Sequence, residues 1–259
     1  MEHSYSLTIE FLGTGTSLGV PIIGCGCAVC RSTDTRDRRL RTSALFTVDG
    51  RRLLIDAGPD FRYQMLRAAV THIDGIMLTH EHADHIFGLD DIRAFNWMQG
   101  PVNLYAEERV LQNLRRVYDY AFIPAPYPGS PKLALHSIDM QPFDVAGISV
   151  IPVRGWHHRL PVLGFRIGNA AYLTDVKTVA VAEQQKLLGL DILIVNALRH
   201  TSHHSHFNLE EALQLINTVK PRHAWLTHIS HDMGLYAETC QNLPENVSIA
   251  YDGLIIENT

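Results

Sequence analysis

Three histidines and an aspartate lie within six residues, in the pattern His80-x-His82-x-Asp84-His85. They follow an apolar run, residues 74–78, that reads as a short buried strand. In an extended segment, residues two apart point the same way, so His80 and His82 can reach one metal ion. Asp84 and His85 stand at the start of a helix-like segment and turn toward a second position beside the first. Imidazole and carboxylate are the usual ligands of hydrolytic metal sites, so the pattern predicts a site for two metals rather than a polar loop with ordinary surface histidines.

Other polar residues stand where strand-like apolar runs end. Buried sheets deliver side chains to the rim of an active site in this way. At Asp56, which a glycine follows closely, a supporting role at the sheet edge and a simple turn are both open. The polar residues after such runs are Asp56, Thr174, Asp175, Asn196, Thr227 and His228, with His231 three residues further on.

The cysteines predict a second kind of metal site. Cys25, Cys27 and Cys30 are spaced C-x-C-x-x-C, and Cys240 is distant from them. In a chain without an export signal, such a triplet indicates metal binding rather than disulfides. Three thiolates can bind one zinc ion, with a fourth ligand from elsewhere completing a closed, structural site. Cys240 is expected to be a packed free thiol.

Composition limits the classes of function. The 259 residues are 46% hydrophobic and 19% charged, which is ordinary for a soluble enzyme, and the net charge is −5. This charge gives no general attraction for nucleic acid or anionic membranes. No apolar run has the length of a membrane span, and residues 1–5 lack the features of a signal peptide, so we expect a cytoplasmic protein with no membrane partner.

The remaining pattern alternates strands and helices without a domain linker. A glycine-rich loop, residues 13–19, follows the first strand but does not open a helix, which argues against a dinucleotide site. Residues 121–131 carry four prolines and are expected to be a loop and a wall of the pocket. The expected strands are 6–12, 43–48, 52–55, 102–105, 143–152, 163–167, 171–173, 191–195 and 224–226, and the expected helices are 60–69, 107–118 and 208–220.

The ordered set of candidate ligands closely resembles that of the metallo-β-lactamase superfamily. The set comprises the six-residue pattern, one later histidine, Asp175 and His228, and the resemblance extends over essentially the whole chain. It implies an α/β fold, a four-layer αββα sandwich with the site at one edge of two packed sheets, as a single hydrolase domain spanning residues 1–259.

Finer motifs resemble one branch of this superfamily, the PhnP family of cyclic phosphodiesterases. They are Leu12-Gly13-Thr14-Gly15, Gly19-Val20-Pro21, the cysteine triplet and the segment from Thr227 to His231. The resemblance implies a structural zinc ion on Cys25, Cys27, Cys30 and His231. It implies two active-site ions, manganese or zinc with manganese favoured, held by His80, His82, Asp84, His85, Asp175 as the bridge, and His228. Either His157 or His158 completes the set, and we favour His157.

The resemblance also implies a role for His206 as general acid, beside Asp84 in the catalytic group. For His206 the alternative is a surface position in a histidine-rich loop, and His200, His203 and His204 are expected to be pocket lining or surface residues. The segments 156–163 and 200–205 are expected to line the substrate pocket, and they are not close copies of the phosphonate enzyme, so the substrate is left open. Enzymes of this kind are often dimers, so a homodimer is one of the oligomeric states that the sequence leaves open.

These residues favour hydrolysis of a small phosphate ester. Two ions can share a hydroxide and neutralise charge on phosphate, and a histidine of near-neutral pKa can protonate the leaving oxygen. The expected function is therefore a metal-dependent phosphodiesterase acting on a small cyclic phosphate or nucleotide-like ester. Three alternatives remain: a tRNA 3′-processing endonuclease, which would need a basic surface for RNA, a thioester or lactam hydrolase, and a non-catalytic metal-binding protein of cofactor biosynthesis.

Overall fold

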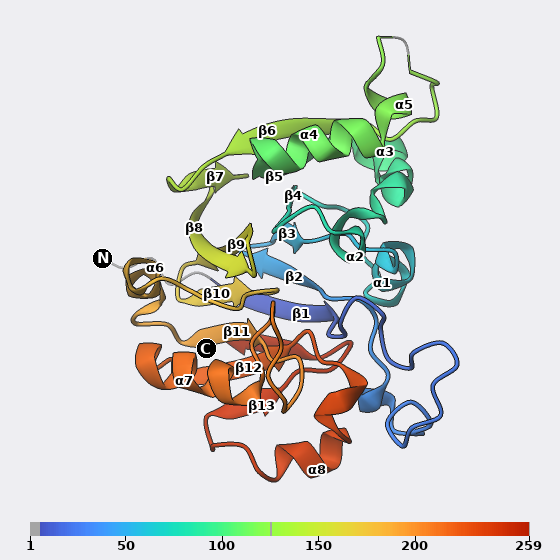
Figure 1. Ribbon diagram of the computed structural model, residues 1–259. Coiled ribbons are helices and arrows are strands. Elements are labelled where there is room, and N and C mark those ends of the chain that lie inside the picture. The colour runs from blue at the N-terminus through green and yellow to red at the C-terminus, as the bar shows by residue number, and fades with distance from the viewer. Residues whose placement is uncertain (1–5, 125, 259) are drawn as a thin grey trace.

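Two seven-stranded sheets form the centre of the molecule (Figure 1). The computed structural model describes residues 6–124 and 126–258; residues 1–5, on which the signal-peptide expectation rests, lie outside this range. The first sheet runs in the order β14 (Ile255–Asn258), β1 (Leu7–Gly13), β2 (Ser43–Val48), β3 (Arg51–Ile55), β4 (Gly75–Met77), β5 (Val102–Glu107) and β6 (Leu133–Ile138). The second runs β13 (Val247–Ile249), β12 (His223–Thr227), β11 (Ile192–Asn196), β10 (Ala170–Leu173), β9 (Leu160–Ile167), β8 (Ile148–His157) and β7 (Phe143–Val145).

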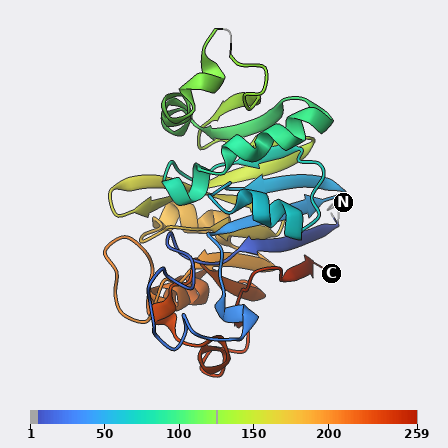
Figure 2. The same ribbon diagram turned by 90° about the vertical axis from the view of Figure 1, so that its right-hand side faces the viewer.

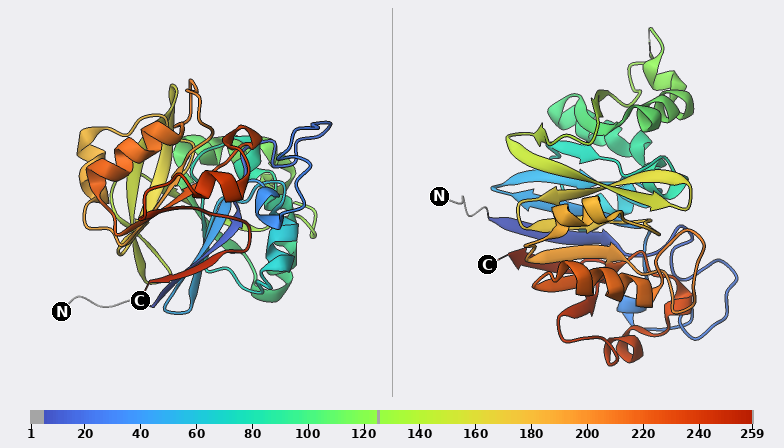
Figure 3. Two further views of the ribbon diagram at one scale, coloured as in Figure 1. Left: turned by 90° about the horizontal axis from the view of Figure 1, so that it is seen from below. Right: turned by 60° about the vertical axis from the view of Figure 1, so that its left-hand side comes forward.

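Helices cover the outer face of each sheet, which gives four layers (Figure 3, left). Figure 2 shows the helices that lie between β3 and β5 in sequence crossing in front of the first sheet. The helices of the first half are α1 (Phe61–Arg67), α2 (Ala83–Ile86), α3 (Arg93–Gln99), α4 (Glu108–Val117) and α5 (Asp119–Phe122). Those of the second half are α6 (Val181–Gln184), α7 (Leu209–Val219) and α8 (Tyr236–Cys240). The predicted αββα sandwich is confirmed.

Three apolar clusters hold these layers together. The central cluster joins the facing surfaces of the two sheets and contains Phe46 from β2 and Phe165 and Tyr172 from the second sheet. The other two clusters lie between each sheet and its own helices. Strands β10 and β11 are buried along their whole length, as expected for inner strands that are covered on both faces. The ends of these strands, where the polar residues begin, are therefore held in place by the core.

Element boundaries follow local sequence signals. Helix α7 begins after a capping box in which the Asn208 side chain accepts from the Glu211 N–H and the Glu211 carboxylate accepts from the Asn208 N–H. The single strand expected over residues 143–152 is instead the hairpin β7–β8, because Ala146 and Gly147 both take positive φ and form a tight turn. No helix in the described part of the chain is long and apolar enough to span a membrane.

The proline-rich segment does not line the candidate site. Its residues and the start of β6 surround a separate cavity of about 550 Å³ beside α5. The pocket that contains candidate metal ligands is elsewhere and is lined by other segments. No described residue of this segment, 121–124 or 126–131, lines that pocket, so the expectation that residues 121–131 form a wall of the active site was wrong. Residues 121–122 end α5, and the described residues after them lie between α5 and the edge strand β6.

Candidate metal centre and active site

The histidine-rich stretch forms the connection between β4 and α2. His82 is the N-terminal cap residue of α2, and Asp84 and His85 lie in its only turn. His80 and His85 are fully buried, whereas His82 is exposed. His80 Nε2 and His82 Nδ1 are 2.9 Å apart. The extended segment thus directs two imidazoles to one point, and the helix turn directs Asp84 and His85 to another.

Asp175 lies between two groups of metal-ligating atoms. One group is Asp84, His85, Asp175 and His228; the other is His80, His82 and Asp175; in each group the ligand atoms lie within 4.8 Å of one another. Asp175 Oδ1 is 3.3 Å from His85 Nε2 and 3.2 Å from His228 Nδ1. Its Oδ2 is 3.9 Å from His80 Nε2. One oxygen therefore faces each group, which is the arrangement that a bridging carboxylate requires.

His157 joins these residues and His158 does not. Nδ1–H of His157 donates to the Ser205 carbonyl at 2.9 Å, which leaves Nε2 as the atom with a free lone pair. The His157 ring lies 5.1 Å from that of His82, and its ligand atom groups with those of Asp175 and His206. His158 is exposed in the turn that follows β8 and belongs to no metal-ligating group in the described residues.

Asp56 supports the first group from behind. Its Oδ2 lies 2.7 Å from His85 Nδ1, and its carboxylate accepts from both the N–H and the hydroxyl of Thr79. The Thr79 hydroxyl is also 2.9 Å from His80 Nδ1. Asp56 is completely buried and takes a positive φ of 61°, an unusual conformation for a residue other than glycine. Of the two interpretations open for Asp56, the support role fits this geometry.

The electrostatics of the site favour cation binding. Burial raises the pKa of Asp175, but the surrounding imidazoles of His228 and His85 outweigh burial and hold it well below its usual range. Burial lowers the pKa of His228 to about 4 and that of His80 well below its ordinary value, so both are neutral. Burial also lowers the pKa of His85, but three neighbouring carboxylates outweigh it and raise this pKa well above normal. The carboxylates around His85 therefore create a strong negative field, and neutral imidazoles lie beside it. This combination attracts and can ligate a divalent cation.

The residues present fit two divalent metal ions. Nε2 of His85 and Nε2 of His228 are buried without a hydrogen-bond partner. Such orphaned atoms are rare in folded proteins and need an explanation. An all-imidazole and carboxylate donor set is suited to zinc, manganese or iron.

The three cysteines and His231 form a separate cluster. The sulfur atoms of Cys25, Cys27 and Cys30 lie 3.4, 3.4 and 3.5 Å from His231 Nδ1. A tetrahedral zinc ion with ordinary bond lengths would set sulfur and nitrogen roughly 3.6 Å apart. The cluster packs against Val20 and other apolar side chains of the loop between β1 and β2. It therefore fits one structural zinc ion.

His206 lies against the Asp175 carboxylate. Its Nε2 is 3.1 Å from Asp175 Oδ2, and its Nδ1 is 3.2 Å from Ser205 Oγ and from His203 Nδ1. The side chain is buried, with 9% of the residue exposed. The sequence alternative of a surface histidine does not fit this position. His200 contacts the Met233 carbonyl instead, away from this group.

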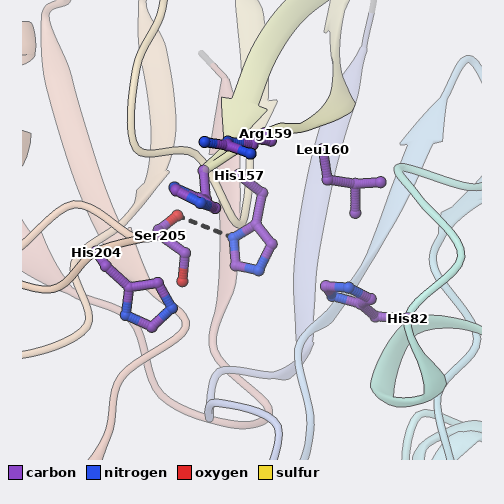
Figure 4. A pocket seen from close by; sticks show the side chains of 7 residues that line it. His82, His157, Arg159, Leu160, His204 and Ser205 are labelled. Carbon is purple, nitrogen blue, oxygen red and sulfur yellow. Dashed lines mark hydrogen bonds between the residues drawn. The ribbon is translucent and has the colours of Figure 1, made fainter.

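A pocket of about 460 Å³ opens beside His82 and His157 (Figure 4). The hairpin turn between β8 and β9 and the loop before α7 form its walls. Its lining residues are His82, His157, His158, Arg159, Leu160, His204 and Ser205.

Sequence reasoning missed one arginine near the site. Arg109, on α4, pairs with Glu81, which lies between His80 and His82, and donates to the Pro161 carbonyl at 2.8 Å. No spacing signal could reveal it, because Arg109 reaches Glu81 across 28 positions. Arg159 lies at the pocket, within the segment 156–163 that was expected to line it.

Comparison with known proteins identifies the family. The beta-lactamase superfamily domain matches residues 51–229. The crystal structure of a diphosphatase from the PhnP family is 41% identical and superposes with a TM-score of 0.92, covering 98% of this chain and 97% of that one. An octanoyltransferase from Porphyromonas gingivalis is 45% identical over 247 residues, which is 94% of this chain and 50% of the relative. A coenzyme PQQ synthesis protein B from Rhodopseudomonas palustris is 29% identical over 178 residues, which is 59% of this chain and 56% of the relative.

The chain thus spans only about half the length of these two curated relatives. The family match and the near-complete overlap with the PhnP-family structure do not depend on that unmatched length. The protein belongs to the metallo-β-lactamase superfamily and, within it, to the PhnP family.

Proposed function

We propose that this protein is a dinuclear metal-dependent hydrolase that cleaves small phosphate esters at a phosphorus atom carrying two ester or anhydride oxygens. The observation that carries the proposal is Asp175, whose two oxygens face two ligand groups while Nε2 of His206 lies 3.1 Å from its Oδ2. The proposed ligands are His80, His82, His157 and Asp175 for one ion, and Asp84, His85, Asp175 and His228 for the other. Manganese or zinc suits these donors, and zinc suits the cysteine cluster.

When bound, the two ions would supply an activated water and neutralise negative charge on the phosphate. The chain supplies orientation and a proton. Asp56 and Thr79 hold the rings of His85 and His80, and the Ser205 carbonyl holds the ring of His157. His206 would carry the proton that the leaving oxygen requires, because its Nε2 points to the carboxylate between the two groups.

The size of the pocket and the similarity to the PhnP-family diphosphatase both support a small phosphate-containing substrate. A cavity of about 460 Å³ suits a small molecule rather than a folded RNA. The PhnP-family neighbour is named a diphosphatase, which supports a diester or phosphoanhydride bond as the target. The reduced thiols proposed for the zinc cluster suit a cytoplasmic protein. The His206 position argues against a non-catalytic metal-binding role.

The test is a substrate panel with chelator-stripped protein reloaded with manganese or zinc. It contains bis(p-nitrophenyl) phosphate, a 2′,3′-cyclic nucleotide, a dinucleoside diphosphate, p-nitrophenyl phosphate as the monoester, and octanoyl-coenzyme A as the thioester. We expect metal-dependent turnover of the diesters or the diphosphate, with the monoester untouched. Exposed His136 on β6 provides the control His136→Ala, which should match wild type. Thioester hydrolysis without diester or diphosphate hydrolysis would refute the proposal.

A further inference from the structure

The segments that supply His82 and His157 are joined by a backbone hydrogen bond that lies behind the candidate ligands. The Leu163 N–H, on β9, donates to the carbonyl of Thr79, at the start of the histidine-rich stretch, at 3.0 Å. Nearer to His157 in the hairpin, β9 carries Pro161, which has no N–H and cannot donate a second bond of this kind. A donor that joins the two segments at this point must come from another element.

Arg109 supplies this donor. It lies in the first turn of α4, and its guanidinium donates to the Pro161 carbonyl at 2.8 Å and pairs with the Glu81 carboxylate. Glu81 directly precedes His82, and Pro161 lies opposite the residue that precedes His157. The two imidazoles border one pocket from different segments (Figure 4). One guanidinium therefore connects the immediate surroundings of two candidate ligands of the same ion.

His82 depends on its backbone more than the other two imidazoles of this ion. The rings of His80 and His157 each contact a supporting oxygen through Nδ1, at 2.9 Å in both cases. For the ring of His82, the described residues provide one hydrogen-bonding contact, from Nδ1 to Nε2 of His80, which is itself a candidate ligand. The residue is also exposed. The position of His82 is therefore set by the backbone that Glu81 anchors.

The pairing of Glu81 with Arg109 is partly buried. The Glu81 side chain is 18% exposed, and its Oε2 is buried without a hydrogen-bond partner, while its Oε1 pairs with Arg109. Removing one partner of a buried ion pair leaves an uncompensated charge, which costs more than the intact pair contributes. Without Arg109, we expect the Glu81 carboxylate to turn toward water and to move the backbone of His82 with it.

We propose that Arg109 is a positioning residue, which holds His82 at the distance from His157 that a shared metal ion requires. The inference rests on the metal ligands of the proposed function, and it assigns Arg109 to one of the two ions. The ligands of the other ion have a different support, since Asp56 contacts His85. Loss of Arg109 should therefore weaken the binding of the two ions unequally.

The test counts metal ions in Arg109→Gln. Protein with zinc in the cysteine cluster is dialysed at a free manganese concentration that keeps the dinuclear site of wild type full, and both elements are measured. Arg109→Gln should bind one manganese ion about tenfold more weakly and keep the other manganese ion and the zinc. A folding defect would lower all three together. The manganese EPR spectrum should change from that of a coupled pair to that of a single ion, and it should match His157→Ala rather than His228→Ala.

Further variants separate the two-point contact from charge. Arg109→Lys keeps the charge but not the guanidinium fork, so it should recover less than half of the loss. Glu81→Gln should weaken the same ion, and the double variant with Arg109→Gln should be no weaker than Arg109→Gln alone, because the two residues form one contact. Arg115, on the same helix, pairs with exposed Glu108, and the control Arg115→Gln should match wild type.

The inference is overturned if Arg109→Gln keeps both manganese ions at wild-type affinity or weakens both equally, if its EPR spectrum matches His228→Ala, or if Arg109→Lys recovers fully. Losses that multiply in the double variant would also overturn it. Because no turnover is measured, the failures of the two proposals are distinguishable. Selective loss of one ion with no hydrolysis in the substrate panel would refute only the proposed function. Hydrolysis with both ions retained in Arg109→Gln would refute only the positioning role, and wild type with fewer than two manganese ions would refute both.

Discussion

The substitution Asp56→Asn tests whether the buried carboxylate behind the site sets the metal-binding tautomer of His85. Asp56 offers two acceptor oxygens, to the Thr79 N–H at 2.9 Å and to His85 Nδ1 at 2.7 Å. Asparagine keeps one oxygen and replaces the other with an N–H₂ donor. If the amide nitrogen faces His85, Nδ1 must accept and the proton moves to Nε2, the atom that faces Asp84 and Asp175. If the amide nitrogen faces Thr79, two donors oppose each other in a buried site.

Either arrangement should weaken metal binding. Loss of a hydrogen-bond partner behind a metal-ligating histidine costs about 10- to 100-fold in affinity. This corresponds to about 1.4–2.7 kcal/mol per ion. The metal-free protein should not lose comparable stability, because burial raises the pKa of Asp56 and the substitution removes a charge that burial disfavours.

The assay combines metal titration with thermal unfolding. Asp56→Asn should bind manganese or zinc at the dinuclear site at least tenfold more weakly, and it should lose most of the rise in Tm that these ions give wild type. The control Asp119→Asn alters an exposed carboxylate whose hydrogen bond is to the adjacent Tyr120 N–H, and it should change neither quantity. Metal affinity within threefold of wild type in Asp56→Asn would refute the argument that this carboxylate sets the ring orientation and tautomer.

Three further outcomes are expected. Cys27→Ser should remove one zinc ion per chain and lower the Tm while the dinuclear ions stay bound, as elemental analysis can measure; equal loss at both sites would contradict their separation. His206→Gln should lower kcat/KM about 100-fold for a diester with an alkoxide leaving group but only a few-fold for p-nitrophenolate, which needs no proton; an equal loss for both would exclude proton donation. Carboxylates raise the pKa of His85, so metal binding near neutral pH should release a proton from this side chain and should become tighter as the pH rises. Calorimetry in buffers of different ionisation enthalpy measures the number of protons released. Zero release would count against a protonated His85.

The convergence of two candidate ligands could be predicted from the sequence where the geometry is local. His80 and His82 are two apart in extended chain, so their convergence needs only the strand period. The four-layer fold was predictable because the resemblance covers the whole chain. The choice between His157 and His158 had no such local signal. It depends on the hairpin register, and a shift of one residue would exchange which of the two side chains points into the site.

The structure also changes the interpretation of the pocket wall. The prolines of residues 121–131 predicted a loop; residues 121–122 instead end α5, and the described residues 123–124 and 126–131 lie in no helix or strand. A composition signal cannot say which cavity a loop borders. The walls come from the β8–β9 turn and the segment before α7, within the two segments, 156–163 and 200–205, that were expected from the sequence to line the substrate pocket. The first of these segments also carries His157, so a candidate metal ligand and the pocket wall share this part of the chain.

The segment after β12 connects the two candidate metal sites, and its backbone predicts that losing a metal ion from one site need not destroy the other. His228 lies with Asp84, His85 and Asp175, and His231, three residues later, lies with the cysteines. Between them, the Ile229 N–H donates to the Thr14 carbonyl at 2.8 Å, and the Ile229 carbonyl accepts from the Thr16 N–H at 3.2 Å. These bonds hold the segment to the loop after β1 independently of any zinc ion. Removing zinc would therefore release His231 and the cysteine loop, whereas His228, on the other side of this backbone attachment, would keep its position beside Asp175.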